Sequence, residues 1–271
     1  MMRIGLSLVA CCAFGCGPAS RTGHEHPDAS GGADSGGGNG DATIGQTYVY
    51  AHTMSTLYRV DPDTLAISMV GNFNWPNGSD MMTDIAIDKN GMMLGLSFTS
   101  VYRIDPATAK ATLLSNGLTG TFNGLSFVPA SQLGQTGDDV LVATRNADGI
   151  VFRVDPASGQ TTQIGNMGSF VSSGDLVSID GFGTVLTAGN GLSNDQLVRL
   201  APQTFAATPI GTDIGYANIW GLAFWKNRIF GFTNVGQFVL IDPTTGHGSV
   251  VQSNGPAWWG AAVTTSAPVI Q

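Results

Sequence analysis

Cysteine and glutamate are almost absent from this 271-residue chain. The three cysteines, Cys11, Cys12 and Cys16, all lie near the N-terminus, so the remainder can form no disulfide framework, thiol nucleophile or cysteine metal site. The single glutamate is Glu25, and charged residues make up only 11% of the chain. A net charge of -8 argues against nucleic-acid binding, because phosphate recognition requires a cationic face.

Familiar catalytic motifs are missing as well. The sequence contains no Gly-x-Ser-x-Gly nucleophile turn, no His-Glu-x-x-His zinc motif and no EF-hand calcium loop. We therefore assign no catalytic residue, and the sequence favours a non-catalytic role over an enzyme.

The first 44 residues differ in composition from the rest. Residues 1–16 place one arginine before a short apolar run that ends in small residues and cysteine, which is the layout of a signal peptide. The stretch resembles a bacterial lipoprotein signal with its lipobox, which implies acylation, by palmitate or a similar chain, of Cys16 or alternatively of Cys11. Such chains would hold the protein on a membrane, and no other membrane contact is expected. Residues 17–44 are rich in Gly, Ser and Asp and are predicted to form a disordered tether.

Five copies of one pattern organise residues 45–271. Each copy is an alternating strand that runs into a turn, which contains Asp-Pro in all but the fourth: Leu57–Pro62, Val101–Pro106, Val151–Pro156, Leu197–Pro202 and Phe238–Pro243. Asp accepts hydrogen bonds from turn amides and Pro presets φ, so each copy is expected to be a hairpin between the third and fourth strands of a sheet. Repeats of this length, made of short strands, predict a β-propeller.

The two chain ends complete each other in this pattern. The N-terminal part supplies three strands without a first one, whereas Trp259–Val263 looks like a first strand with nothing after it. Joining them would close an all-β, five-bladed propeller with four strands per blade, because an open ring would leave unpaired sheet edges. In the second blade, for example, the strands are expected at Asp84–Ile87, Met92–Leu96, Val101–Ile104 and Ala109–Leu114.

The repeat itself resembles a known type. Tyr58-Arg59-Val60-Asp61-Pro62-Asp63-Thr64 is similar to the Tyr-x-Ile/Val-Asp-Pro-x-Thr-Gly signature of bacterial extracytoplasmic propellers related to the YVTN repeat proteins. The resemblance implies a location in the bacterial cell envelope, with the lipid anchor in the outer membrane or at the cell surface. It implies no particular activity, because propellers of this type host binders, lyases and lactonases alike.

The starts of the first strands are expected at the mouth of the central channel, on the face opposite the Asp-Pro turns. Asp84 and Asp175 occupy equivalent positions there, and His52 ends a strand on the same side. One hypothesis is a Ca²⁺ site in which Asn123 and carbonyl oxygens join the two carboxylates. Another is a lactonase or lyase with an Asp base and His52 as acid. A third is that both Asp side chains only cap backbone amides.

Aromatic residues in the connections suggest a contact surface. Trp75, Trp220 and Trp258, with His52 and Asn123, are predicted to contact a protein or a glycan. The alternative is that the aromatic rings wedge between blades. Three functions follow as hypotheses: a membrane-anchored, non-catalytic interaction module; a Ca²⁺-assisted lactonase or lyase; and a structural envelope lipoprotein.

Overall fold

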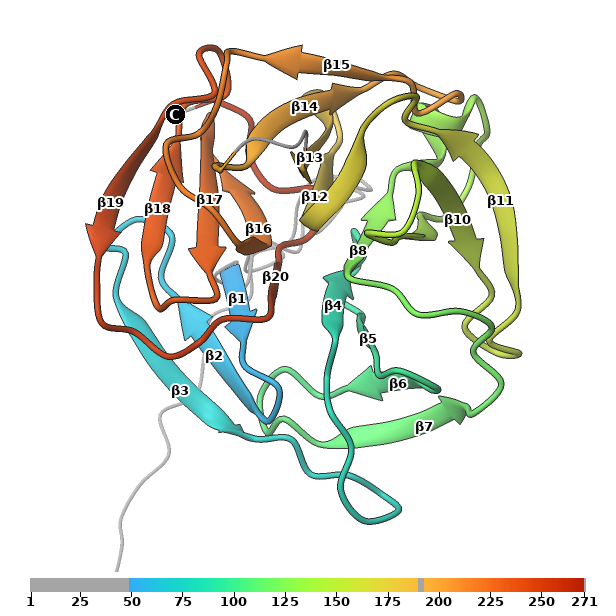
Figure 1. Ribbon diagram of the computed structural model, residues 1–271. Helices are drawn as coiled ribbons and strands as arrows, with labels where there is room; N and C mark the ends of the chain where they lie inside the picture. The colour runs from blue at the N-terminus through green and yellow to red at the C-terminus, as the bar shows by residue number, and fades with distance from the viewer. Residues whose placement is uncertain (1–48, 190–192, 271) are drawn as a thin grey trace, which may run out of the picture. The chain divides into compact units, whose positions relative to one another are not determined.

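Twenty short strands form five four-stranded antiparallel sheets. The structure is a computed structural model that describes residues 49–189 and 193–270, so both candidate lipidation sites and the predicted tether lie outside the described residues. Figure 1 shows the sheets arranged around a centre, with the first strand of each blade innermost. The prediction of a five-bladed β-propeller is confirmed.

One blade is built from both ends of the described chain. Strand β20 (Gly260–Ala262) pairs antiparallel with β1 (Val49–His52), and His52 lies opposite Gly260. The sheet continues through β2 (Thr56–Val60) to β3 (Ile67–Asn72). The predicted closure is therefore present, with β20 two residues shorter than the expected strand.

The other four blades each come from one continuous segment. The second blade comprises β4 (Asp84–Ile87), β5 (Met93–Leu96), β6 (Val101–Ile104) and β7 (Ala111–Ser115). The third comprises β8 (Gly124–Val128), β9 (Val140–Thr144), β10 (Ile150–Val154) and β11 (Thr161–Asn166), with a short 3-10 turn at Ala130–Leu133. The fourth comprises β12 (Val171–Ile179), β13 (Gly183–Gly189), β14 (Gln196–Leu200) and β15 (Ala207–Ile210). The fifth comprises β16 (Ile219–Trp225), β17 (Arg228–Thr233), β18 (Phe238–Ile241) and β19 (Gly248–Gln252).

The Asp-Pro motifs form the hairpin turns that the sequence predicts. Asp61 Oδ1 accepts hydrogen bonds from the backbone N–H of Asp63 at 3.0 Å and of Thr64 at 2.8 Å, and Asp105, Asp155 and Asp242 cap their turns in the same way. The fourth copy has Ala201 at this position and keeps the backbone bonds, from Phe205 N–H to Ala201 O at 2.9 Å and from Ala201 N–H to Ala206 O at 3.0 Å, without a side-chain cap. Turn chemistry therefore accounts for the recurrence of the motif.

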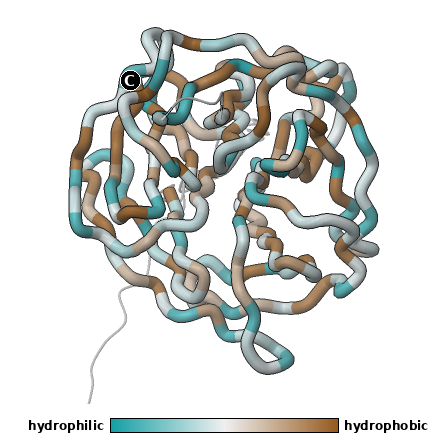
Figure 2. The backbone as a smooth tube through the Cα atoms, in the orientation of Figure 1, coloured by the Kyte–Doolittle hydropathy of each residue, from teal (hydrophilic) through white to brown (hydrophobic). Residues whose placement is uncertain are grey.

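Hydrophobic clusters fill the spaces between neighbouring blades. The largest contains side chains from the first, fourth and fifth blades, including Val49, Val177, Phe224 and Trp258. In Figure 2 the hydrophobic stretches follow the strands, whereas hydrophilic residues gather at the connections. The core is thus shared around the ring, and each blade depends on its two neighbours.

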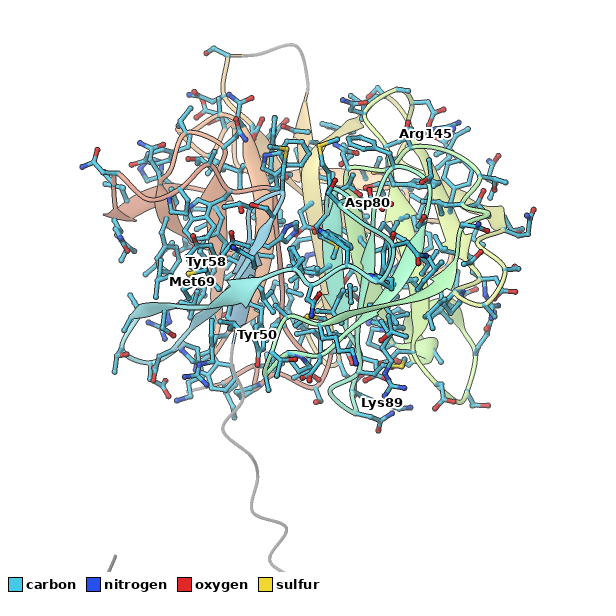
Figure 3. All side chains as sticks on the ribbon, turned by 90° about the horizontal axis from the view of Figure 1, so that it is seen from below. Tyr50, Tyr58, Met69, Asp80, Lys89 and Arg145 are labelled. Carbon is cyan, nitrogen blue, oxygen red and sulfur yellow. The ribbon has the colours of Figure 1, made fainter. Side chains whose placement is uncertain are left out.

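The two faces of the propeller carry different connections. Arg145, between β9 and β10, and Lys89, between β4 and β5, lie at opposite faces (Figure 3). We call the side of Arg145 the loop face; it carries the connections from second to third strands and those that lead from one blade to the next. On the other face, Thr264 Oγ1 donates to Asp88 O at 2.8 Å and Lys226 N–H donates to Pro268 O at 2.8 Å, so the segment after β20 ties separate blades together.

In the part of the chain that the structure describes, no helix has the length and apolar character needed to cross a membrane.

Candidate functional site

Each inner strand has one of five equivalent positions at or a few residues after its start, and these positions are occupied by Asp or Gly. The first blade has Gly260, the second Asp84, the third Gly124, the fourth Asp175 and the fifth Gly221. Adjacent inner strands contact one another, so side chains at these positions face a narrow centre. We call these five residues the inner ring.

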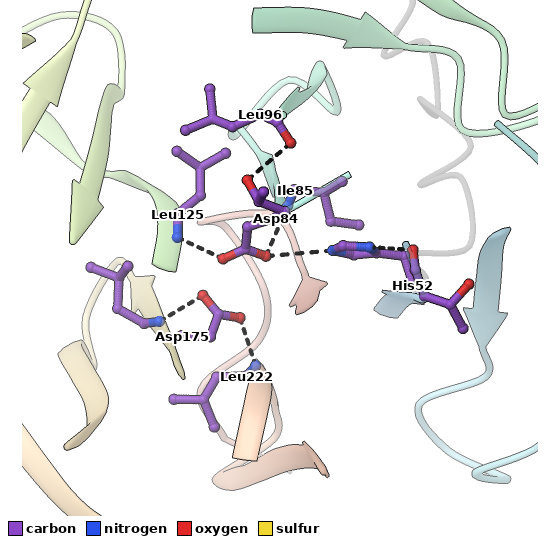
Figure 4. Close-up of polar contacts among 10 residues, drawn as sticks. His52, Asp84, Ile85, Leu96, Leu125, Asp175 and Leu222 are labelled. Atoms are coloured by element: carbon purple, nitrogen blue, oxygen red, sulfur yellow. Dashed lines mark hydrogen bonds and ion pairs between the residues drawn. The ribbon is translucent and has the colours of Figure 1, made fainter. Parts of the chain in front are cut away.

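Each inner-ring carboxylate joins its own blade to the next one. Asp84 Oδ1 accepts a hydrogen bond from Ile85 N–H at 2.8 Å, and its Oδ2 accepts one at 2.7 Å from Leu125 N–H in β8. Asp175 repeats the arrangement, accepting from Leu176 N–H and, in β16, from Leu222 N–H, both at 2.6 Å. Figure 4 shows the two carboxyl groups side by side in this cradle of amides.

Asp84 and Asp175, the carboxyl pair, are both protonated more readily than ordinary aspartates. Burial is the main cause of the raised pKa of Asp84, which lies well above its usual value; the charge of Asp175 and a hydrogen bond to it add to the shift. Burial also raises the pKa of Asp175 to about 8, although hydrogen bonds with the backbone amide of Leu222 and with Asp84 act to lower it.

His52 lies beside the pair without a hydrogen bond to it. Its Nδ1–H donates to Thr53 O at 2.8 Å, and its Nε2 is 3.7 Å from Asp84 Oδ1, which is too long for a hydrogen bond. Burial lowers the pKa of His52 to about 4, with the Thr53 carbonyl opposing the shift. His52 is therefore a neutral ring at pH 7 and cannot act there as a general acid without a large rearrangement.

Glycine at the remaining inner-ring positions leaves room for these side chains. A Cβ at Gly260 would overlap Asp84 Oδ1 and His52 Nε2, and one at Gly124 would overlap Thr144 Oγ1 and lie 2.7 Å from Gly174 O. A Cβ at Gly221 would lie 2.7 Å from the backbone of Gly260, so none of the three glycines could carry a side chain without a shift of its neighbours. The centre of the propeller at this level is a packed core.

The surroundings of the carboxyl pair do not suit a Ca²⁺ ion. All four carboxylate oxygens accept a hydrogen bond from a backbone N–H group. Ca²⁺ requires six to eight oxygen ligands. Within residues 49–189 and 193–270, no group of three or more His, Cys, Asp or Glu side chains is placed to hold a metal ion. The geometry matches the amide-capping alternative.

A pocket opens on the loop face, one residue above the inner ring, and we call it the channel-mouth pocket. It has a volume of about 230 Å³. Its aromatic walls are Phe98, Phe122, Trp220 and Trp259. Its polar walls are Thr83, Asn123, Asn146 and Ser173. None of the described residues that line it carries a charge.

The structure divides the predicted contact residues between two environments. Asn123 and Trp220 line the channel-mouth pocket. Trp75 instead packs against Phe73 and Tyr102, with ring centroids 5.5 and 5.0 Å away. Trp258 is 1% exposed in the core between blades, so a direct contact with a ligand would require that core to open.

Trp259 and Phe98 line the pocket but are not among the contact residues predicted from the sequence. Trp258 and Trp259 directly precede β20, and their side chains diverge: Trp258 lies in the core between blades, whereas Trp259 lines the pocket. The sequence does contain a pattern that indicates Trp259 as a pocket residue. It directly precedes Gly260, as Trp220 precedes Gly221 and Asn123 precedes Gly124. Ser173 was hidden for a different reason, because a register shift between Ser172 and Leu176 displaces the start of β12.

Comparisons with known proteins bear on the fold alone. No family model matches the chain, and no curated protein matches it with significance. One similar solved structure is the "Crystal structure of Nidogen/Laminin Complex", with a TM-score of 0.55, 9% identity and coverage of 82% of this chain and 100% of that one. Another is from "The de novo evolutionary emergence of a symmetrical protein is shaped by folding constraints", with a TM-score of 0.52, 17% identity and coverage of 83% and 100%. At these identities the likeness supports the propeller architecture.

Proposed function

We propose that this chain is a non-catalytic binding module of the bacterial cell envelope, which presents its loop face to a protein or a glycan. The observation that carries the proposal is the channel-mouth pocket, where aromatic and uncharged polar side chains from several blades converge. Pockets of this composition are typical of ligand-binding sites. The inner ring below it serves a different purpose, since its carboxylates are held by backbone amides.

The anchor in this proposal comes from the sequence. Residues 1–16 have the order of a lipoprotein signal, with Cys16 as the acyl acceptor and Cys11 as the alternative. The Gly-rich residues 17–44 would then act as a tether that holds the propeller away from the lipid headgroups. Together these features support a position of the proposed binding face outside the cytoplasm.

The lactonase or lyase alternative is weaker on chemical grounds. It needs a carboxylate free to take a proton and a histidine able to give one. Asp84 and Asp175 are both bound by two amides, and His52 has a pKa of about 4. The structural-lipoprotein alternative differs in another respect, because it assigns no role to the pocket.

Substitution of Trp259 tests the binding proposal. The twenty strands of the described residues lie between positions 49 and 262, so a protein of residues 45–271 contains all of them. We expect Trp259→Ala to reduce retention of this protein on isolated envelope material about tenfold, because a buried aromatic anchor dominates such contacts. Met69→Ala is the control, since Met69 is 58% exposed on the outer strand β3. Equal retention of both variants and the unsubstituted protein would contradict the proposal.

A further inference from the structure

The geometry of the channel-mouth pocket points to a particular ligand class: we propose that it binds one uncharged pyranose ring of a glycan. This inference rests on the proposed binding function and specifies its ligand. Three features of the pocket carry it, namely the arrangement of its two tryptophans, the hydrogen-bonding state of its polar atoms and its lack of charged walls.

Trp220 and Trp259 form a right-angled corner. Their ring centroids are 5.7 Å apart and their planes meet at 88°. Each ring packs its edge or face on the other, so both are braced before a ligand arrives and little ordering is required on binding. A pyranose has a flat C–H face that can stack on one indole, while the second indole limits the ring at its side.

The opposite walls are also aromatic. Phe98 is 41% exposed, which leaves its ring available at the rim. Phe122 is 4% exposed and is held edge-on by Phe152 at 5.5 Å. The apolar surface thus surrounds a space of about 230 Å³, a size suited to a single ring rather than to a long segment of chain.

Three of the residues that line the pocket, Thr83, Ser173 and Asn123, carry side-chain oxygens that can accept hydrogen bonds. The Thr83 hydroxyl donates to Leu96 O at 3.1 Å, and the Ser173 hydroxyl donates to Asp195 Oδ1 at 2.5 Å. Because their hydrogens are already used, these two hydroxyls can only accept a hydrogen bond from a ligand. Asn123 Oδ1 is a buried atom that has no partner among the described residues. A buried acceptor of this kind is costly unless a donor reaches it.

This donor requirement separates ligand classes. Sugar hydroxyls supply several O–H donors around the edge of an apolar face, which matches acceptors set among aromatic rings. An aliphatic or phenylalanine side chain of a protein supplies none. A carboxylate or phosphate group is also disfavoured, because it only accepts hydrogen bonds and would lose hydration without a cationic partner.

Titration with simple sugars tests the inference. The full-length protein, labelled with ¹⁵N, would be titrated with the methyl glycosides of glucose, galactose, mannose and N-acetylglucosamine. We expect at least one to bind with a Kd on the order of 1 mM or tighter and to shift the indole N–H resonances of Trp220 and Trp259. Trp220→Ala and Asn123→Ala should each weaken that binding about tenfold, whereas Met69→Ala should not change it. Glucuronic acid, which adds a carboxylate to the same ring, should bind at least about tenfold more weakly than glucoside.

Failure has two distinguishable forms. If none of the sugars binds, or if N-acetyl-phenylalanine amide binds the pocket in their place, the pyranose inference is overturned. The broader proposal survives that result if Trp259→Ala still lowers retention on envelope material. If the sugars fail and Trp259→Ala also leaves retention unchanged, both are overturned.

Discussion

Replacement of Gly260 by alanine should destabilise the propeller by about 3 kcal/mol, which for a domain of this size lowers Tm by roughly 10 °C. Gly260 begins β20, the strand that closes the ring. The added Cβ would overlap Asp84 Oδ1, which accepts from Ile85 N–H, and Nε2 of the buried His52 ring, which is held through its Nδ1–H bond to Thr53 O. Neither side chain can move aside without leaving a buried polar group unpaired.

Gly71→Ala is the matched control for this substitution. Gly71 also lies in a strand of the closing blade, but a Cβ there would approach no atom outside its chain neighbours closer than 3.7 Å. We expect its Tm to differ from that of the unsubstituted protein by no more than a few degrees. Equal thermal unfolding of the two variants would show that the inner ring has room to spare, contrary to a packed centre.

Substitution of Asp84 should have a second large effect, which depends on pH. Asp84→Ala leaves the N–H groups of Ile85 and Leu125 without their acceptors, and at about 1–3 kcal/mol each this costs roughly 2–6 kcal/mol. Asp84→Asn retains one carbonyl oxygen, so about half of that loss is expected. Chemical denaturation at constant pH measures both.

The pH dependence follows from the raised pKa values of the carboxyl pair. The folded protein holds protons that the unfolded chain releases above its ordinary Asp pKa of 3.8. The stabilisation from these protons is complete below that value and is lost as pH rises through the folded pKa, about 8 for Asp175. The free energy of unfolding should therefore fall between pH 6.5 and 8.5, by up to about 1.4 kcal/mol per pH unit for each retained proton.

The lower limit of pH 6.5 avoids an opposing contribution from His52. Burial lowers the pKa of His52 to about 4, so the folded protein disfavours the charged ring. The free energy of unfolding therefore decreases as pH falls from 6.5 toward 4. Within the chosen window, Asp84→Ala and Asp84→Asn should both show a smaller decline than the unsubstituted protein, because one titrating group is gone. An unchanged slope in both variants would mean that the carboxyl pair does not hold the extra protons.

The sequence predicts the architecture well because one local motif, a strand followed by a turn, is repeated. The Asp-Pro turn, the alternating strand before it and the regular spacing are all short-range features, and each recurs in the structure. The split blade could be predicted because the ends of the pattern are complementary. The register shift in β12, between Ser172 and Leu176, is not part of this repeated pattern.

The contacts of the site residues could be predicted less well from the sequence, for two physical reasons. The bond from Asp84 to Leu125 joins residues 41 positions apart, and only the closed ring brings these inner strands together. The choice between Trp258 and Trp259 depends on a one-residue register that reverses which side chain faces the core. The alternation of Asp and Gly along the inner ring was nonetheless visible, and it is the pattern that now explains why Asp84 and Asp175 are buried.

The central claim is that the loop face binds its ligand in the channel-mouth pocket, and a crystallographic soak with small neutral fragments tests it most directly. Fragments collect in the pockets that a protein uses for binding. We predict density in the cavity between Trp220, Trp259 and Asn123. Fragments that instead fill the larger groove beside Arg153 and Gln160, of about 680 Å³, and leave the cavity between the tryptophans empty would contradict the claim.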